Sequence, residues 1–209
     1  MNRLHAILFA ALASAGLTAA ALELDDVARE GELRFLAVRP DPGAYWYESQ
    51  VRIAPDSLDT GLVELRTCHH ALDPNRRIVI AFNPQRVQHI AIASTQGVGK
   101  AWVEGHRVEL ADVQRGGQVC INLRSRALER IDGSQRYRLH AGPLMRRYLD
   151  GYLPMQAKLA FEWPAGLLQV ASTQPAAQPG VQVNAQGDGL RMDIVFAGRM
   201  SATVELERR

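Results

Sequence analysis

The feature that most constrains this chain is a series of short apolar or alternating segments separated by turn-forming residues. They recur about every 8–12 residues, with Gly, Pro, Asn and Asp between them, which is typical of an all-β sandwich or barrel. Val181 and Val183 alternate with Gln182 and Asn184, as in a strand with one buried face. The apolar segment 78–82 suits a strand buried on both faces.

Strands are predicted at 33–39, 45–53, 62–68, 78–82, 87–93, 101–104, 107–110, 119–123, 135–139, 155–163, 167–172, 181–184, 190–196 and 201–206. The fold class predicted from them is all-β, an immunoglobulin-like β-sandwich. Either one large sandwich or two small packed sandwiches would accommodate so many strands.

Segment 143–152 is the best helical candidate. It begins with a proline, which favours the first position of a helix, and a glycine near its end can terminate one. Leu144, Tyr148 and Tyr152 recur at every fourth residue and would share one helix face. The sequence therefore predicts one short helix near 143–152.

This predicted helix also marks a joint in the chain. The region 22–142 is predicted to be a β-sandwich region that holds both cysteines, and 143–209 to be the helix plus a C-terminal β-rich subdomain. In that subdomain, the residues from Phe161 to Leu168 (FEWPAGLL) place a Pro/Gly corner after an apolar strand, and Val195 to Gly198 (VFAG) close a later one. This block, about a quarter of the chain, resembles immunoglobulin-like or cohesin-like sandwich modules, a resemblance that implies architecture and no function.

The N-terminus predicts export. Arg3 precedes an apolar run at 4–22 that ends in small residues, and this order describes a secretory signal peptide over 1–21, cleaved near Ala20 or Ala21. The alternative is a retained membrane anchor, but the run is padded with Ala, Ser, Gly and Thr, which insert weakly. No cysteine follows the run, which argues against a lipoprotein. The mature protein is expected to be periplasmic, in a Gram-negative-type cell, or secreted, with no stable membrane span after cleavage.

Charge excludes one class of partner. The chain has 24 Lys and Arg against 22 Asp and Glu, and basic residues never run longer than pairs, so no nucleic-acid partner is expected. Nearly all basic residues are Arg, which suits recognition of anions but equally reflects codon usage.

Cys68 and Cys120 are the two cysteines. An even count in an exported chain predicts a disulfide, here a structural one that joins two strands distant in sequence. The chain-entropy model gives such a loop roughly 3–4 kcal/mol of stabilisation. The spacing is far from Cys-x-x-Cys, which argues against a thiol oxidoreductase.

Two aromatic and cationic clusters are the candidate ligand-binding residues. Exposed aromatic rings beside Arg can stack on sugars or anchor a protein partner. Alternation along a strand would place one member of the first cluster on the face opposite to the other two. The candidates are Tyr45, Trp46, Tyr47, Arg146, Arg147 and Tyr148.

Histidines offer an alternative site for copper or zinc. The candidate ligands are His69, His70, His89 and His106. Adjacent residues of a strand point to opposite faces, so the first two would not ligate together, and ordinary half-buried histidines explain the pattern equally well. No cofactor is expected.

Motifs for catalysis are weak. The sequence contains neither Gly-x-Ser-x-Gly nor Ser-x-x-Lys. The run from Gly97 to Lys100 resembles the end of a phosphate-binding loop, but Ser94 replaces the leading glycine and Ala101 the magnesium-binding hydroxyl residue. A pair of scattered carboxylates for glycoside cleavage stays open.

The function expected from these observations is an exported, non-catalytic envelope protein, a binding or assembly module for a protein or glycan partner. The alternatives are a periplasmic copper- or zinc-binding protein and a carbohydrate-active hydrolase. A cluster of three histidines would favour the first alternative, and a cleft with two facing carboxylates the second.

Overall fold

The structure, a computed structural model, describes residues 27–131, 133–149 and 151–209. The predicted signal peptide, 1–21, lies outside the described residues. The prediction of an all-β sandwich is confirmed. No helix in the described part of the chain is long and apolar enough to cross a membrane.

One short helix and fifteen strands make up the described fold. In chain order they are β1 (Leu33–Phe35), β2 (Trp46–Arg52), α1 (Ser57–Thr60), β3 (Leu62–Leu72), β4 (Asn75–Ala81), β5 (Val87–Glu104), β6 (Arg107–Arg126), β7 (Leu128–Arg130), β8 (Arg136–Leu144), β9 (Arg146–Tyr148), β10 (Gly151–Leu153), β11 (Met155–Glu162), β12 (Leu168–Gln174), β13 (Val181–Gln186), β14 (Gly189–Gly198) and β15 (Met200–Arg208).

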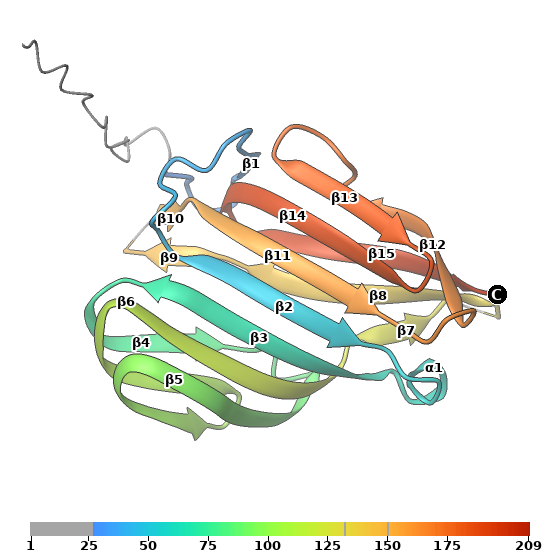
Figure 1. The fold of residues 1–209 in the computed structure, drawn as a ribbon, viewed down its shortest axis with the longest axis horizontal. Coiled ribbons are helices and arrows are strands. Elements are labelled where there is room, and N and C mark those ends of the chain that lie inside the picture. Colours follow the sequence, from blue (N-terminus) through green and yellow to red (C-terminus); the bar gives the residue numbers. More distant parts are fainter. Residues whose placement is uncertain (1–26, 132, 150) are drawn as a thin grey trace, which may run out of the picture.

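The larger sheet has nine strands, most of them visible side by side in Figure 1. Its main path runs β1-β14-β11-β2-β3-β6-β4, while β13 pairs with β14 and β5 with β6. Strands β2 and β11 pair in parallel, and the other pairs of this sheet are antiparallel. We call the face of this sheet that carries Val51, Leu65 and Leu123 its inner face, since these side chains point between the layers.

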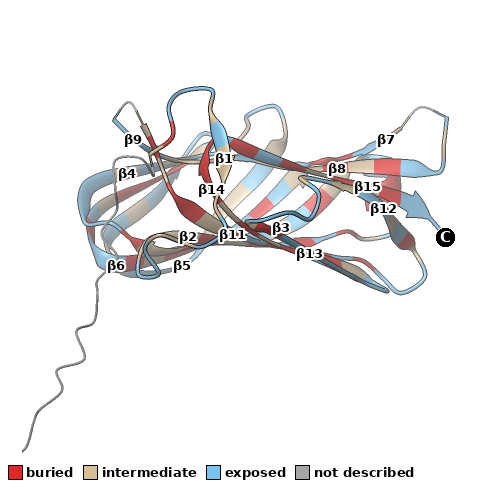
Figure 2. Cartoon of the chain, turned by 90° about the horizontal axis from the view of Figure 1, so that it is seen from above, coloured by how far each residue is buried: buried red, intermediate tan, exposed pale blue. Residues whose placement is uncertain are grey.

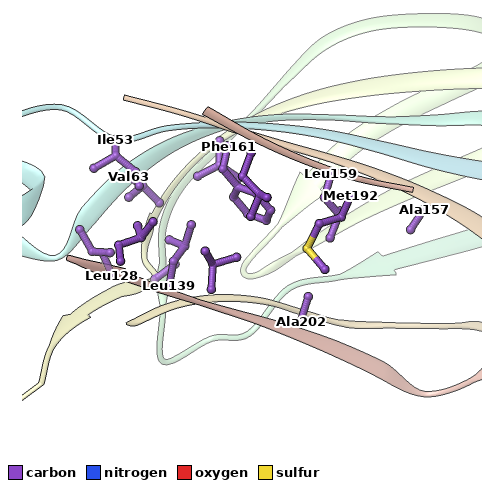
Figure 3. Close-up of a cluster of buried hydrophobic side chains, with 14 of the residues drawn as sticks. Ile53, Val63, Leu128, Leu139, Ala157, Leu159, Phe161, Met192 and Ala202 are labelled. Carbon is purple, nitrogen blue, oxygen red and sulfur yellow. The ribbon is translucent and has the colours of Figure 1, made fainter. Parts of the chain in front are cut away.

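The smaller sheet has four strands in the order β12-β15-β8-β7 and forms a second layer over the larger one (Figure 2). Buried side chains of both sheets meet between the layers. Phe161 and Met192 come from the larger sheet, and Leu139 and Ala202 from the smaller one (Figure 3). The Trp163 indole is buried at the edge of this core and donates a hydrogen bond to the Leu168 carbonyl at 2.9 Å.

Both sheets combine strands from the two regions separated by residue 143. In the larger sheet, β11 from the later region lies between β14 and β2. In the smaller sheet, β15 from the later region pairs with β8, which begins in the earlier one. The strands therefore form one large sandwich, the first of the two expected arrangements.

The long hairpin β5–β6 gives the larger sheet its second apolar cluster. From Gly117 to Arg126, β6 pairs with β3, while from Arg107 to Val113 it pairs with β4. Strand β5 follows β6 along both parts through three register shifts, and such bulges increase the bend of a sheet. The buried cluster contains Leu72, Val108, Leu110, Val113, Val119, Ile121 and Leu123.

The predicted disulfide between Cys68 and Cys120 is confirmed. The two residues face each other in register on neighbouring strands β3 and β6, with their Cα atoms 4.1 Å apart. Because side chains alternate along a strand, the bridge lies on the face opposite to the inner face.

The predicted helix near 143–152 is wrong. Leu144 ends β8, and β9 pairs antiparallel with β10 in a hairpin whose Leu149 has a positive φ of 50°. The apolar residues at every fourth position do not share one face. Tyr152 is buried beside Ala28 and Ala197, whereas Tyr148 is exposed. Tertiary contacts of a short segment overrode its local helical pattern.

Candidate functional site

A cavity of about 1210 Å³ opens between the sheets, and β4 and the end of β8 both line it. This exceeds the range of roughly 300–1,000 Å³ common for pockets that hold drug-sized ligands. Most of its lining is apolar. The apolar side chains include Val51, Leu65, Ile78, Ile80, Phe82, Leu123, Leu139, Leu144, Met155 and Leu159.

Unpaired strand edges explain why the layers are open at this point. Among the described residues, β4 pairs only with β6. The part of β8 from Ala141 to Leu144 pairs only with β15, because β7 covers β8 no further than Leu139. Neither edge is hydrogen-bonded to the other, so the sandwich does not close into a barrel there.

The register of β2, β3 and β6 orders the inner-face side chains of these strands, and all of them except Val119 and Ile121 line the cavity. Three rows run across these strands: Tyr47, His69 and Val119; then Ser49, Thr67 and Ile121; then Val51, Leu65 and Leu123. The first two rows carry polar groups and the third is apolar throughout. The wall of the cavity therefore changes from polar to apolar along its length.

We call Tyr45, Tyr47, Ser49, Thr67 and His69 the polar patch. All five line the cavity, and four of them are buried, the exception being the half-buried Tyr45. Burial raises the pKa of Tyr47 to about 12, and it also raises the pKa of Tyr45. Both phenols therefore keep their protons at neutral pH and act as neutral hydrogen-bonding groups.

His69 is 7% exposed and is neutral at pH 7, because burial, and then the nearby His70, lower its pKa to about 3. The Tyr45 hydroxyl lies 2.8 Å from its Nδ1, the one hydrogen-bond partner of that hydroxyl among the described residues. We assign the hydroxyl proton to Nδ1, since the opposite tautomer would leave that proton without a partner. A neutral imidazole has one acceptor and one donor nitrogen, so Nε2 carries the ring proton in this assignment. This Nε2–H has no partner in the described part of the chain.

Thr67 presents a second unmatched polar group. Its side chain is 1% exposed, and its Oγ1 has no hydrogen-bond partner among the residues that the structure describes. A buried polar group left unsatisfied costs roughly 1–3 kcal/mol, so such groups call for a specific explanation. Here Thr67 and His69 are neighbouring inner-face residues of β3 that both line the cavity, and a bound acceptor would satisfy both.

The polar end of the cavity is also cationic. The Arg146 guanidinium lies 5.9 Å from the centre of the Tyr45 ring and forms an ion pair with Asp73. Arg147 and Arg199 line the same cavity, and Asp73 is the one carboxylate among its described lining residues. Arg86 lines the cavity at its other end, beyond the apolar row.

The two clusters predicted as ligand-binding residues meet at this cavity, with one exception. Tyr45 and Tyr47 line it together with all three residues of the second cluster, Arg146, Arg147 and Tyr148. These contacts place the residues and leave their predicted role untested.

Trp46 lies on the opposite face of the sheet, as strand alternation predicts. Its ring stacks on His70 at 3.8 Å, with Lys158 at 5.0 Å from its centre. His70 in turn lies 3.3 Å from the Glu48 carboxylate. None of these four side chains lines the cavity.

The four histidines proposed as an alternative metal site do not gather. His69 points to the inner face and His70 to the outer face, while His89 and His106 are exposed on the β5–β6 hairpin and its turn. Within the described ranges, no group of three or more His, Cys, Asp or Glu side chains is placed to hold a metal ion.

A second cavity, of about 510 Å³, lies beside α1 and the start of β7. It is lined by Asp59 and Glu129, the kind of pair a glycosidase would need. His140 hydrogen-bonds Glu129 at 3.0 Å and lowers the pKa of that carboxyl, with Arg138 in support. A glycosidase acid needs a raised pKa, so this environment does not favour the hydrolase alternative.

Ser49, Thr67 and Arg199 are cavity residues that the sequence did not single out. A signal for Thr67 was present, since Val63, Leu65, Thr67 and His69 alternate in β3 with outward residues. A hydroxyl and an imidazole at inward positions of an otherwise apolar series indicate polar groups facing an interior space. Arg199 gave no such signal, because its position depends on the pairing of β15 with β8.

Comparisons with known proteins give only a distant likeness. No protein-family model and no curated protein matches this chain. One similar solved structure is an M1 zinc metallopeptidase of Deinococcus radiodurans bound to a Tyr-Ser-Ala substrate, with 11% identity, a TM-score of 0.40, and coverage of 86% of this chain and 43% of that one. Another is a two-domain M1 zinc metallopeptidase bound to L-tryptophan, with 10% identity, a TM-score of 0.39, and coverage of 86% and 44%. The chain spans less than half the length of either structure.

Proposed function

We propose that this protein is an exported, non-catalytic binding module that takes an apolar portion of an envelope component into the cavity between its sheets. One observation carries the proposal. A cavity of about 1210 Å³ with a largely apolar lining is bordered by Thr67 and His69, each of which has a buried polar atom without a partner in the described part of the chain. Large apolar pockets with a few convergent polar groups are the usual form of ligand sites.

The side chains of the cavity favour binding over catalysis. His69, with its pKa lowered to about 3, is a weak base at neutral pH. The one described carboxylate in the lining, Asp73, is held in an ion pair with Arg146. These groups supply hydrogen bonds and charge for recognition, without the acid and base of a hydrolase.

The apolar lining narrows the class of partner. A bare glycan exposes mainly polar groups and would leave the apolar side chains uncovered, whereas a partner with an acyl chain or apolar side chains would cover them. Placement in the envelope rests on the signal peptide predicted over 1–21. A protein recovered from the periplasm with a mass that begins near Ala21 or Leu22 would support export.

The experiment that tests the cavity uses N-phenyl-1-naphthylamine, an uncharged dye that fluoresces in apolar sites. The wild-type protein should bind it, and Leu65→Trp, which places a larger side chain in the apolar row, should weaken binding at least tenfold. Leu65→Phe is a milder second variant, and Leu33→Trp on exposed β1 is the matched control. Equal binding by wild type and both Leu65 variants would contradict the proposal.

A further inference from the structure

We infer that the cavity binds an amphipathic molecule with one long alkyl chain and an anionic head group. The head group lies against the polar patch and Arg146, and the chain runs along the apolar row. Long-chain carboxylates and lysophospholipids share this chemistry. The inference rests on the proposed function and specifies the ligand of the same site.

The unmatched polar groups set the chemistry of the head. His69 presents Nε2–H, and Thr67 presents a hydroxyl that is also free to donate. Both residues line the cavity on the inner face of β3, and these two polar atoms are themselves buried. Nε2–H can only donate and the Thr67 hydroxyl can donate or accept, so a head group whose acceptor oxygen reaches them satisfies both, whereas a purely donating head would leave Nε2–H unpaired.

Charge at the same end favours an anion. Three arginines, Arg146, Arg147 and Arg199, line it, against one carboxylate, Asp73, among the described lining residues. Arg146 is paired with Asp73, and Arg147 lies 4.0 Å from the exposed Glu30. The described lining therefore has more positive than negative charge, and guanidinium groups bind carboxylate and phosphate oxygens in a bidentate geometry.

The remaining length of the cavity suits an alkyl chain. Beyond Ser49 and Thr67, the row of Val51, Leu65 and Leu123 is apolar. Leu159 of β11 extends this lining in the same sheet, Leu139 adds to it from the other layer, and Phe82 adds to it after the end of β4. A compact ligand would leave much of this cavity empty, while a chain can follow it from the polar end. Each methylene buried in such a lining should strengthen binding about fourfold.

Displacement of N-phenyl-1-naphthylamine at pH 7.5 tests whether the ligand needs an anionic head group and a long alkyl chain. Four competitors are compared: dodecanoate, octanoate, dodecanol and lauroyl lysophosphatidylglycerol. Dodecanoate should bind at least tenfold more tightly than dodecanol, which has the same chain without the charge. It should also bind about 250-fold more tightly than octanoate, which has four fewer methylenes. The two sources of the anionic head group are separated by comparing two affinities. Tighter binding of the lysophospholipid would indicate a lysophospholipid ligand, and tighter binding of dodecanoate a long-chain carboxylate.

Variants locate the head group. Thr67→Val removes one donor and should weaken dodecanoate binding about fivefold or more, while the variant remains at least as stable to unfolding as wild type. Thr95→Val, at an exposed position of β5, is the matched control and should change the affinity for neither dodecanoate nor dodecanol. Arg147→Gln combined with Arg199→Gln should reduce the preference for dodecanoate over dodecanol, and Arg86→Gln at the far end should not.

The outcomes separate the two proposals. If the dye binds and Leu65→Trp blocks it, but dodecanol competes as well as dodecanoate, the head-group inference is wrong and the proposed function stands. Sensitivity to Arg86→Gln in place of the Arg147 and Arg199 pair would overturn the assigned orientation. If the dye does not bind to the wild type, both fail.

Discussion

At the scale of single residues, the protein's distinctive feature is the polar patch on an otherwise apolar inner face. Ser49 and Thr67 stand in register between Leu159 of β11 and Ile121 of β6. Apolar residues there would extend the core across the sheet without interruption. Their polarity, together with His69 in the next row, gives the interior a place for a hydrogen-bonding group.

His69 makes the stability of the protein sensitive to mild acid. Its pKa is lowered to about 3 in the folded state against 6.5 in the unfolded chain, so only the unfolded chain takes up the proton as the pH falls below 6.5. Stability is then lost with falling pH down to pH 3. Between pH 7 and pH 5 this loss is about 2 kcal/mol.

His69→Gln keeps an acceptor for the Tyr45 hydroxyl and removes the titration. Urea unfolding measures the free energy of unfolding at pH 7 and at pH 5. The decrease between these two pH values should be smaller in the variant than in wild type by about 2 kcal/mol. Identical pH dependence in the two proteins would mean that His69 is protonated in the folded state.

Residue patterns could predict part of this site. Alternation placed Tyr45 and Tyr47 on one face of the strand and Trp46 on the other, and the paired histidines on opposite faces, as the structure shows. The sequence could not show that Arg146 lies near the Tyr45 ring, because that contact joins residues 101 positions apart in the chain. It likewise gave no reason to join His69 with Tyr45.

At the scale of elements, strand β3 separates two roles between its faces. Its inward residues Thr67 and His69 border the cavity, while Cys68 between them is bonded to Cys120 on the outer face. The disulfide therefore fixes β3 to β6 without entering the cavity. Strand positions were predictable from their apolar content. However, β3 extends to Leu72, beyond the predicted limit, and β5 joins the strands predicted at 87–93 and 101–104, because pairing with β6 continues there.

The bridge is expected to act on stability alone. The double variant Cys68→Ala with Cys120→Ala should lower the free energy of unfolding by about 3–4 kcal/mol, the chain entropy returned to the unfolded state. Urea unfolding measures this loss. N-phenyl-1-naphthylamine affinity at pH 7.5, measured well below the unfolding transition, should stay within about twofold of wild type. A tenfold loss of affinity in a folded variant would show that the bridge also shapes the cavity.

Gly198 allows β1 to approach β14. It has a φ of +112°, and a Cβ there would lie 2.0 Å from the Glu32 carbonyl oxygen. Gly198→Ala should lower the free energy of unfolding by about 2 kcal/mol or more, through strain and displacement of β1. Gly187→Ala, where a Cβ meets no atom within 4 Å, is the control and should change stability by less than about 0.5 kcal/mol. Equal effects in thermal unfolding would mean that β1 moves freely.

At the scale of the whole molecule, the parallel pairing of β2 with β11 joins the regions before and after residue 143 in one sheet. Strand β2 begins at Trp46 and β11 at Met155, and the strands between them form the rest of the cavity wall. The all-β class could be read from the spacing of strands and turns. The order of strands in the sheets could not, because register partners more than 100 residues apart leave no local pattern in the sequence.

A chain that ends at residue 153 tests this integration. It keeps β2, β3 and β8 but lacks β11 beside β2 and β15 beside β8, so the core between the sheets loses much of both layers. We expect no cooperative urea unfolding of this fragment by circular dichroism. A cooperative transition would show that the earlier region folds independently of the later one.

The unmatched groups on Thr67 and His69 also bear on how this protein responds to engineering. Empty space and unsatisfied polar atoms make the free form less stable than the same fold with a filled, apolar interior. Substitutions selected for heat resistance alone would therefore accumulate at these positions, with larger aliphatic side chains replacing the hydroxyl and the imidazole. Such a protein would unfold at a higher temperature, and its filled cavity would no longer bind a ligand.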